Sequence, residues 1–161
     1  TPIRGDVRIE FDARIVASQE SANQIALFYF YSDPSGRPLS ETRTARADAD
    51  YGIYHKLNGY IMTFLQGPPK EFHPDGSPKA RIRMRRCPGF HLLAETYAYH
   101  SRQNITYHVV LIKRLGRLRC EVDGALLLEA EDAAPLNEGL IGFRTFRTEL
   151  WYDNLRVTAL E

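Results

Sequence analysis

The sequence is poor in cysteine, in net charge and in long hydrophobic runs. Its two cysteines, Cys87 and Cys120, make neither a disulfide framework nor a zinc pattern, so we expect two buried thiols, with a single bridge between them as the alternative. The net charge of +1 gives no field that would attract nucleic acid or an anionic membrane. No apolar run reaches the ~20 residues of a membrane helix. We therefore expect neither nucleic acid nor a membrane among its partners.

Sequence patterns of the common cofactor and nucleophile sites are missing as well. There is no phosphate-binding loop, no dinucleotide fingerprint and no Ser/His/Asp constellation, so we expect no cofactor and no catalytic metal. β-Sandwiches often bind structural calcium, which makes Asp33 and Asp75 weak candidates. Neither aspartate lies in a loop dense in oxygen ligands.

Apolar and polar residues alternate along much of the chain. In residues 7–15, VRIEFDARI, every odd position is apolar and every even position is charged. This period of two is typical of a strand with one buried and one wetted face. Segments with strand character, separated by Gly, Pro and Asp turns, occur at residues 7–15, 25–31, 60–66, 81–85, 90–95, 107–113, 118–123, 126–131, 139–146 and 149–160. No segment predicts a long helix.

These segments predict one all-β domain over residues 1–161. The length fits one domain, and no linker or repeat divides the chain. The pair Asp123-Gly124 between two alternating runs is a strong hairpin signal. Short strands at this spacing favour an antiparallel sandwich or barrel, with the polar residues 37–50 as a surface loop.

Arginine is in excess, with 17 arginines against 4 lysines. The guanidinium fork suits two-pronged recognition of carboxylates and phosphates, although GC-rich codon usage is the alternative cause. In residues 81–85 arginine alternates with apolar residues, which places three guanidiniums on one strand face, ~7 Å apart. Such a row needs carboxylates opposite it, either from Glu10, Asp12 or Glu121 on neighbouring strands or from uronic acid residues of a ligand.

Three segments carry a family resemblance that extends over nearly the whole chain. They are residues 51–64, YGIYHKLNGYIMTF, residues 83–95, RMRRCPGFHLLAE, and residues 141–157, IGFRTFRTELWYDNLRV. Together they resemble the YesU-like family of bacterial proteins, whose poorly defined function is associated with breakdown of pectic, rhamnogalacturonan-type polysaccharide. The resemblance implies a concanavalin A-like, two-sheet antiparallel jelly-roll β-sandwich. The ending YDNLRV is also similar to the 3-keto-disaccharide hydrolase family.

The beginning of the chain departs from that family. Another strand or two usually precedes a segment like residues 5–11, whereas this sequence begins at Thr1. Either the N-terminus is trimmed or the sheet is short at one edge, and an exposed edge needs a cover, which makes a homo-oligomer an expectation. We expect a bacterial cytoplasmic protein, with a secreted protein that has lost its leader as the alternative.

Candidate acid–base residues occur in three segments. His91 and Glu95 share one face if residues 90–95 form a regular strand, and they could serve as base and acid. His55 and Tyr60 belong to a Tyr/His/Asn cluster of the type that lyases of acidic polysaccharides use, and Glu149 belongs to the last strand. The alternatives are merely exposed side chains at 91 and 95 and a tyrosine-rich sheet core at 54–60.

Candidate binding residues are aromatic, amide and guanidinium side chains. Trp151 offers a platform for a sugar ring or a hydrophobic plug. It shares one face with Arg147, Glu149 and Asp153 if no bulge intervenes, which leaves Arg144 on the other face. The full set assigned to substrate binding is Tyr54, Asn58, Arg83, Arg85, Arg144, Arg147 and Trp151. We predict that the segments 54–60, 81–95 and 147–151 converge on one concave groove.

One acidic pair invites comparison with sandwich glucanases. Glu121 and Asp123 alternate along a strand, and a glycosidase needs two carboxyl groups ~5 to 9 Å apart. Asp123 runs straight into Gly124, however, so we interpret Asp123 as a turn residue and Glu121 as solvated.

The sequence therefore predicts a carbohydrate-active protein of the YesU-like type. Its expected ligand is an acidic, pectic or rhamnogalacturonan-like oligo- or polysaccharide, on which it acts as a lyase or hydrolase. A non-catalytic, lectin-like binding module and an oligomerising accessory protein are the alternatives.

Overall fold

The computed structural model describes residues 1–18, 24–48, 50–65, 72–78, 80–98 and 101–161. Its strands are β1 (Ile3–Arg4), β2 (Val7–Ser18), β3 (Gln24–Ser32), β4 (Asn58–Leu65), β5 (Ile82–Cys87), β6 (His91–Thr96), β7 (Thr106–Arg114), β8 (Arg117–Val122), β9 (Ala125–Glu131), β10 (Glu138–Arg144) and β11 (Thr148–Ala159). The two helical turns are η1 (Arg43–Arg46) and α1 (Tyr51–Tyr54). Each of the ten predicted strand segments contains a strand, and β1 is additional.

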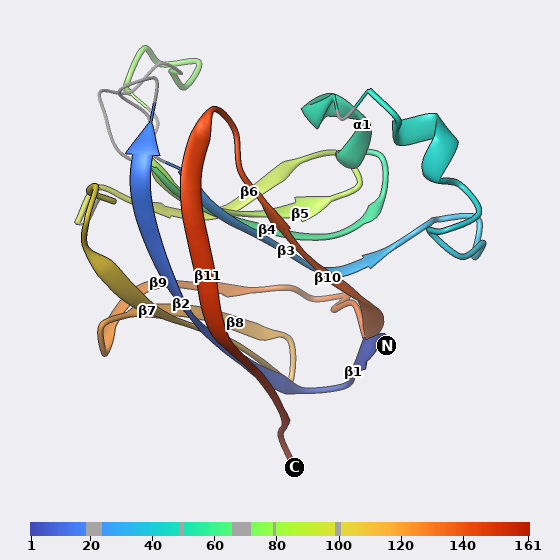
Figure 1. Cartoon of the computed structure of the whole chain (residues 1–161). Helices are drawn as coiled ribbons and strands as arrows, with labels where there is room; N and C mark the ends of the chain where they lie inside the picture. Colours follow the sequence, from blue (N-terminus) through green and yellow to red (C-terminus); the bar gives the residue numbers. More distant parts are fainter. Residues whose placement is uncertain (19–23, 49, 66–71, 79, 99–100) are drawn as a thin grey trace.

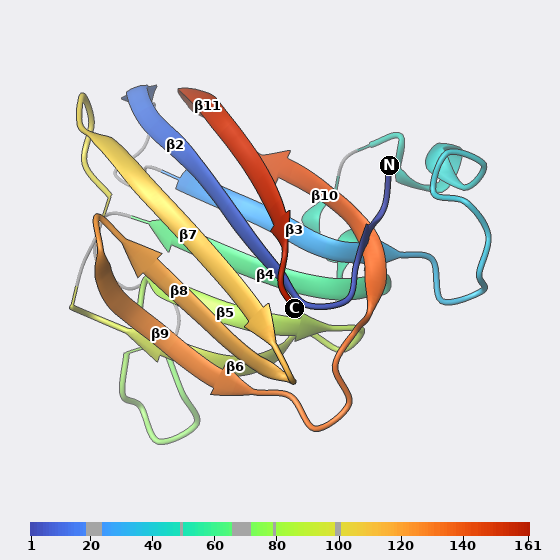
Figure 2. The ribbon, with the colours of Figure 1, turned by 90° about the horizontal axis from the view of Figure 1, so that it is seen from below.

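The strands form two antiparallel sheets packed face to face (Figure 1). One sheet has six strands in the order β1-β10-β3-β4-β5-β6, and the other has five in the order β11-β2-β7-β8-β9. Seen from below, the five-stranded sheet lies in front of the six-stranded one (Figure 2). The predicted all-β, two-sheet antiparallel sandwich is therefore confirmed.

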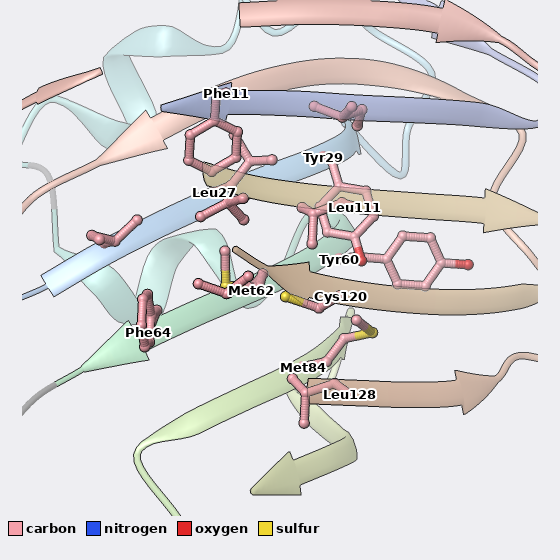
Figure 3. Packing of buried hydrophobic residues seen from close by; sticks show 14 of the residues in the cluster. Phe11, Leu27, Tyr29, Tyr60, Met62, Phe64, Met84, Leu111, Cys120 and Leu128 are labelled. Atoms are coloured by element: carbon pink, nitrogen blue, oxygen red, sulfur yellow. The ribbon is translucent and has the colours of Figure 1, made fainter. Parts of the chain in front are cut away.

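The core lies between the two sheets and is built by the alternation of side chains along each strand. Phe11 and Leu111 from the five-stranded sheet meet Leu27, Met62 and Met84 from the six-stranded sheet (Figure 3). Each of these side chains is almost completely buried. A residue next to an inward-pointing one must point to the outer face of its sheet, and this rule fixes the candidate site described below.

Two glycine positions show why the chain turns and packs as it does. Asp123 and Gly124 both have positive φ, 51° and 82°, which is the requirement of the tight hairpin turn predicted between β8 and β9. At Gly139, a Cβ atom would lie 2.1 Å from the carbonyl carbon of Phe30. β10 can therefore approach β3 this closely only with glycine at position 139.

Both cysteines are buried and free, so the alternative of a bridge is wrong. Cys120 lies in the core between the sheets, whereas Cys87 lies in a second cluster on the outer face of the six-stranded sheet. The two calcium candidates are turn residues: Asp33 accepts hydrogen bonds from Ser35, and Asp75 accepts them from Ser77. Within the described ranges, no group of three or more His, Cys, Asp or Glu side chains is arranged to hold a metal ion.

Two further expectations concern a partner subunit at the sheet edge and a membrane-spanning helix. Within the described part of the chain, β1 pairs with β10 only at Gly139 and Glu138, and a subunit covering this edge stays a prediction. No helix among the described residues is both long and apolar enough to cross a membrane.

Lys113 ties the first strands to the rest of the sandwich. Its side chain is 1% exposed, and its Nζ donates to the carbonyl oxygen of Gly5 at 3.0 Å, to the Asp6 carboxylate at 3.1 Å and to the Asn137 amide oxygen at 3.3 Å. The ammonium also lies 5.1 Å from the Phe30 ring centroid. All three donors of the buried charge therefore have acceptors.

Replacing Lys113 by Met is expected to lower the free energy of unfolding by about 2–3 kcal/mol, because buried acceptors lose their charged donor. The urea midpoint should fall while the m-value stays constant. The matched control Arg117→Met breaks the exposed ion pair with Glu131 and should cost less than about 1 kcal/mol. Equal losses in the two variants would contradict the role of Lys113.

Candidate functional site

Arginine side chains gather on the outer face of the six-stranded sheet. Ile82 and Met84 of β5 enter the core, so Arg83 and Arg85 point the opposite way. Arg144 joins them from β10, where its neighbour Phe143 packs on the core. Arg83 and Arg85 are only 3% and 4% exposed, whereas Arg144 is half-buried. The row predicted at residues 81–85 is thus largely buried on this face.

An aromatic cluster lies on the same face, beside the arginines. Its buried members are Phe28, Tyr31, Leu57, Ile61 and Cys87, and the partly buried Leu39, Tyr51, Tyr54 and Phe90 pack against them. α1 begins at Tyr51 because the Asp50 carboxylate accepts a hydrogen bond from the Gly52 amide at 2.9 Å and caps the turn. In Figure 1, α1 rises over the outer face of this sheet.

The guanidinium groups stack on the rings of this cluster. Arg85 lies 4.3 Å from the ring centroid of Phe90, and Arg144 lies 4.4 Å from that of Tyr51. His55 stacks on Phe90 with ring centroids 3.6 Å apart. Since cation–π attraction strengthens when the pair is shielded from water, these contacts hold both guanidiniums in place.

The charges of this face also act on its titratable groups. Burial raises the pKa of Tyr51, while Arg85, Arg144 and Arg83 oppose that rise by favouring the phenolate. Burial lowers the pKa of His55, and the positive charge of Arg85 lowers it further. His55 is therefore a neutral imidazole near pH 7 and is able to accept a hydrogen bond.

A carboxylate and a second histidine flank the arginines at β6. Glu95 lies directly opposite Arg83 in the β5–β6 ladder. One Glu95 oxygen contacts His73 Nε2 at 2.5 Å, and the other accepts from the Ala80 amide at 3.1 Å. Sequence reasoning missed His73, because it lies in a Gly- and Pro-rich loop with no periodicity to connect it with β6.

We call this surface the arginine face and define it by Tyr51, His55, Arg83, Arg85, Glu95 and Arg144. It unites five predicted residues, namely His55, Arg83, Arg85, Glu95 and Arg144. Tyr54 packs against the aromatic cluster beside it. Asn58 lies at the start of β4, where its amide donates to the Ser32 hydroxyl at 3.2 Å.

Tyr60 does not belong to this face, so its predicted place in the groove is wrong. Its side chain is 0% exposed and points between the sheets (Figure 3). The hydroxyl donates to the Asp132 carboxylate at 2.6 Å and accepts from the Leu136 amide at 3.0 Å. Arg86 contacts the same Asp132 oxygen at 2.7 Å. Tyr60 thus anchors the segment after β9, as the core interpretation of the tyrosine cluster implied.

His91 and Glu95 do not share a face, contrary to expectation. The β5–β6 register shifts between Met84 and Arg85, because Leu93 is an extra residue in β6. His91 therefore lies opposite Arg86, on the other side of the strand from Glu95. A bulge reverses the side-chain alternation that the sequence alone predicts.

The last strand belongs to the other sheet, so the prediction of one shared groove is wrong. Trp151 pairs with Arg14 of β2 and lies on the outer face of the five-stranded sheet, as does the exposed Glu149. Arg147 lies in the β10–β11 turn with φ of 47°, and its guanidinium is 5.2 Å from the Phe146 ring. The outer faces of the two sheets are opposite faces of the sandwich.

The acidic residues expected to answer the arginine row lie elsewhere. Glu10, Asp12 and Glu121 are all in the five-stranded sheet, so none of these three lies opposite the row, whereas Glu95 of the neighbouring strand β6 lies opposite Arg83. Asp123 occupies the predicted hairpin turn and accepts a hydrogen bond from the His108 amide at 2.9 Å. Glu121 lies 3.5 Å from Arg119 in an ion pair.

No protein-family model matches this sequence, and no curated protein matches it. Solved structures do match. The fold is galectin-like. A protein of unknown function with a galectin-like fold from Bacillus subtilis shares 20% identity and a TM-score of 0.74, with 98% of this chain and 73% of that chain covered.

Two further solved structures share the sandwich. The carbohydrate-binding module CBM66 from Bacillus subtilis has 16% identity and a TM-score of 0.62, with 99% of this chain and 78% of that chain covered. A putative glycosyl hydrolase from Parabacteroides distasonis has 11% identity and a TM-score of 0.56, with 100% and 72% covered. At these identities the likeness establishes the fold.

The pKa of His55 is expected to lie below its ordinary value of 6.5 and to rise toward it in Arg85→Gln, since one cause is then removed. NMR titration of the imidazole signals measures both values. Because the neutral form is favoured in the folded state, the stability from this group is present above pH 6.5 and is lost as pH falls through the folded pKa. Arg119→Gln, in the other sheet, is the control and should leave the titration unchanged. A His55 pKa at or above 6.5 would contradict the burial described here.

Proposed function

We propose that the protein binds an acidic oligo- or polysaccharide on its arginine face. The observation that carries this proposal is the grouping of three guanidiniums, from Arg83, Arg85 and Arg144, around Tyr51 on the outer face of a galectin-like sheet. A uronic acid carries one carboxylate per residue, and the planar guanidinium fork binds a carboxylate through two parallel hydrogen bonds.

The three arginines have different parts in this proposal. Arg144 is half-buried and stacks on Tyr51, so it is the most accessible of the three guanidiniums and would contact the ligand carboxylate directly. Arg83 and Arg85 are almost fully buried and would act chiefly through their positive field. Charges in a poorly solvated setting interact more strongly than charges in water, which suits attraction of an anionic chain.

The neighbouring aromatic and imidazole groups suit the rest of a sugar residue. Tyr51, Tyr54 and Phe90 present partly exposed rings beside the arginines. The negative face of an aromatic ring attracts the polarised C–H groups of a pyranose. Neutral His55, stacked on Phe90, adds a half-buried imidazole ring to this group.

The solved structures of similar fold support a saccharide ligand, because one is a carbohydrate-binding module and another a putative glycosyl hydrolase. The sequence resemblance to the YesU-like family supports the finer proposal that the saccharide is pectic or rhamnogalacturonan-like. The solved structures thus support a saccharide ligand, and the sequence resemblance supports an acidic one, whose carboxylates the arginine face would bind.

Arg144→Gln is expected to weaken binding of hexagalacturonate about tenfold, because one charge-assisted, two-pronged contact is lost. Isothermal titration calorimetry at two salt concentrations measures the affinity, which should fall as salt rises. The matched control is Arg156→Gln, which removes an exposed arginine paired with Glu10 on the opposite face. Unchanged affinity in Arg144→Gln, or equal losses in both variants, would overturn the proposal.

A lyase activity is the second candidate, and the contact between His73 and Glu95 beside Arg83 favours it. In such a reaction His73 would remove the proton from the carbon next to the uronate carboxylate. The C4–O4 bond then breaks, a C4=C5 double bond forms, and the departing oxygen gains a proton. Arg83 would balance the negative charge that builds up on the carboxylate.

Incubation with hexagalacturonate distinguishes these activities, with ultraviolet absorbance reporting unsaturated uronate ends. We expect this absorbance to rise for the native protein and to fall at least a hundredfold in rate for His73→Ala, since general base catalysis typically contributes ~10²- to 10⁴-fold. The control His108→Ala, on the opposite face, should keep the native rate. New reducing ends without absorbance would indicate a hydrolase instead, and neither signal would leave a binding module.

A further inference from the structure

Trp151 lies on the face of the sandwich opposite to the arginine face, where it is 56% exposed. Strand pairing sets its neighbours: Trp151 lies opposite Arg14 of β2, and Asp153 lies opposite Asp12. Asp12 in turn lies opposite His108 of β7. Three adjacent strands therefore place an exposed indole beside a patch of polar side chains.

Arg14 is the charged residue in direct contact with the indole. Its guanidinium carbon lies 5.4 Å from the Trp151 ring centroid. Among the residues that the structure describes, the Arg14 side chain has no hydrogen bond or ion pair, and its Nε is buried without a partner. Its neighbours on the same strand differ, since Arg8 and Glu10 pair with each other at 2.7 Å. Arg14 thus holds its guanidinium over the ring of the exposed indole.

The polar side of the patch is rigidly arranged. One oxygen of Asp12 contacts His108 Nδ1 at 2.7 Å, and the other accepts from the Asn154 side-chain amide at 2.7 Å. Asn154 has φ of 54° and sits in a bulge of β11, and its backbone amide donates to Asp153 at 2.7 Å. These bonds hold the carboxylates, the Asn154 amide and the His108 imidazole in a row next to the indole on the same face of the sheet.

We propose that this patch is a second saccharide site, which takes a neutral pyranose chain. The indole would stack on the C–H face of a sugar ring. The hydroxyl groups of the sugar would form hydrogen bonds with the side chains of Arg14, Asp12, Asp153 and Asn154. The carboxylates at Asp12, Asp153 and Glu149 disfavour an acidic sugar here, in contrast to the arginine face.

The composition of the patch also argues for a sugar rather than for a second copy of the chain. The core of a protein–protein interface is depleted in charged residues. Here one large apolar side chain is surrounded by Arg14, Asp12, Asp153 and Glu149, whose charges a second protein would have to desolvate. A hydroxyl-rich ligand can satisfy them instead.

The two sites lie on opposite faces of one rigid sandwich. One protein molecule would therefore hold two saccharide segments at once, an acidic one and a neutral one. On a polysaccharide surface this gives an avidity that neither site has alone.

Trp151 is the sole tryptophan of the chain, so its fluorescence reports this site directly. We expect its emission to shift to shorter wavelength, with saturation, on titration with at least one of the neutral probes cellohexaose, xylohexaose and mannohexaose. Hexagalacturonate should leave the emission unchanged. No shift with any neutral probe, or an equal shift with hexagalacturonate, would overturn the proposal.

Variants separate this site from the arginine face. Affinity for the responding neutral hexasaccharide, measured by NMR line broadening of the sugar, should fall about tenfold or more in Trp151→Ala and in Arg14→Gln. It should not change in Arg144→Gln or in the control Leu115→Ala, which removes another exposed apolar side chain. Unchanged affinity in both Trp151→Ala and Arg14→Gln would overturn the proposal, as would an emission that depends on protein concentration through self-association.

Discussion

The pleat of β5 is the constraint on which the candidate site depends. Ile82 and Met84 are buried in the core between the sheets. Arg83 and Arg85, which alternate with them along the strand, must therefore point to the outer face. Burying a guanidinium is costly unless other groups compensate for the lost water. Stacking of Arg85 on Phe90 is one such compensation, and it links the charge to the aromatic cluster beneath α1. Core packing and a positive outer face are therefore two consequences of one alternating strand.

The same alternation gives the sandwich two chemically different outer faces. The six-stranded sheet presents arginines and tyrosines beneath α1, whereas the five-stranded sheet presents ion pairs, the network around Asp12 and an exposed Trp151. One fold can carry many unrelated functions, so activity has to be argued from the residues on these faces and not from the fold. The arginine face suits an anionic chain, and the Trp151 face suits an uncharged one.

Local pattern was enough to predict the strands and the sandwich. The alternation of apolar and polar residues is visible in the sequence even when the pairing of the strands is unknown. It also predicted that Arg83 and Arg85 share a face. It failed where long-range pairing or a bulge decides the outcome: Leu93 is an extra residue that turns His91 away from Glu95, and the pairing of β11 with β2 carries Trp151 to the far side. Tyr60 could have been recognised as inward from its parity with Met62. The contact of His73 with Glu95 depends on a loop fold that no periodicity encodes.

The arginine face is the surface on which we propose that an acidic saccharide binds. NMR mapping of the backbone amides and arginine Nε–H groups during titration with hexagalacturonate locates the bound saccharide on the sandwich. We expect the signals of Arg83, Arg85, Arg144 and Tyr51 to shift together with saturation, while the indole N–H signal of Trp151 stays in place. Shifts confined to the Trp151 face, with the arginine signals unmoved, would contradict the proposal.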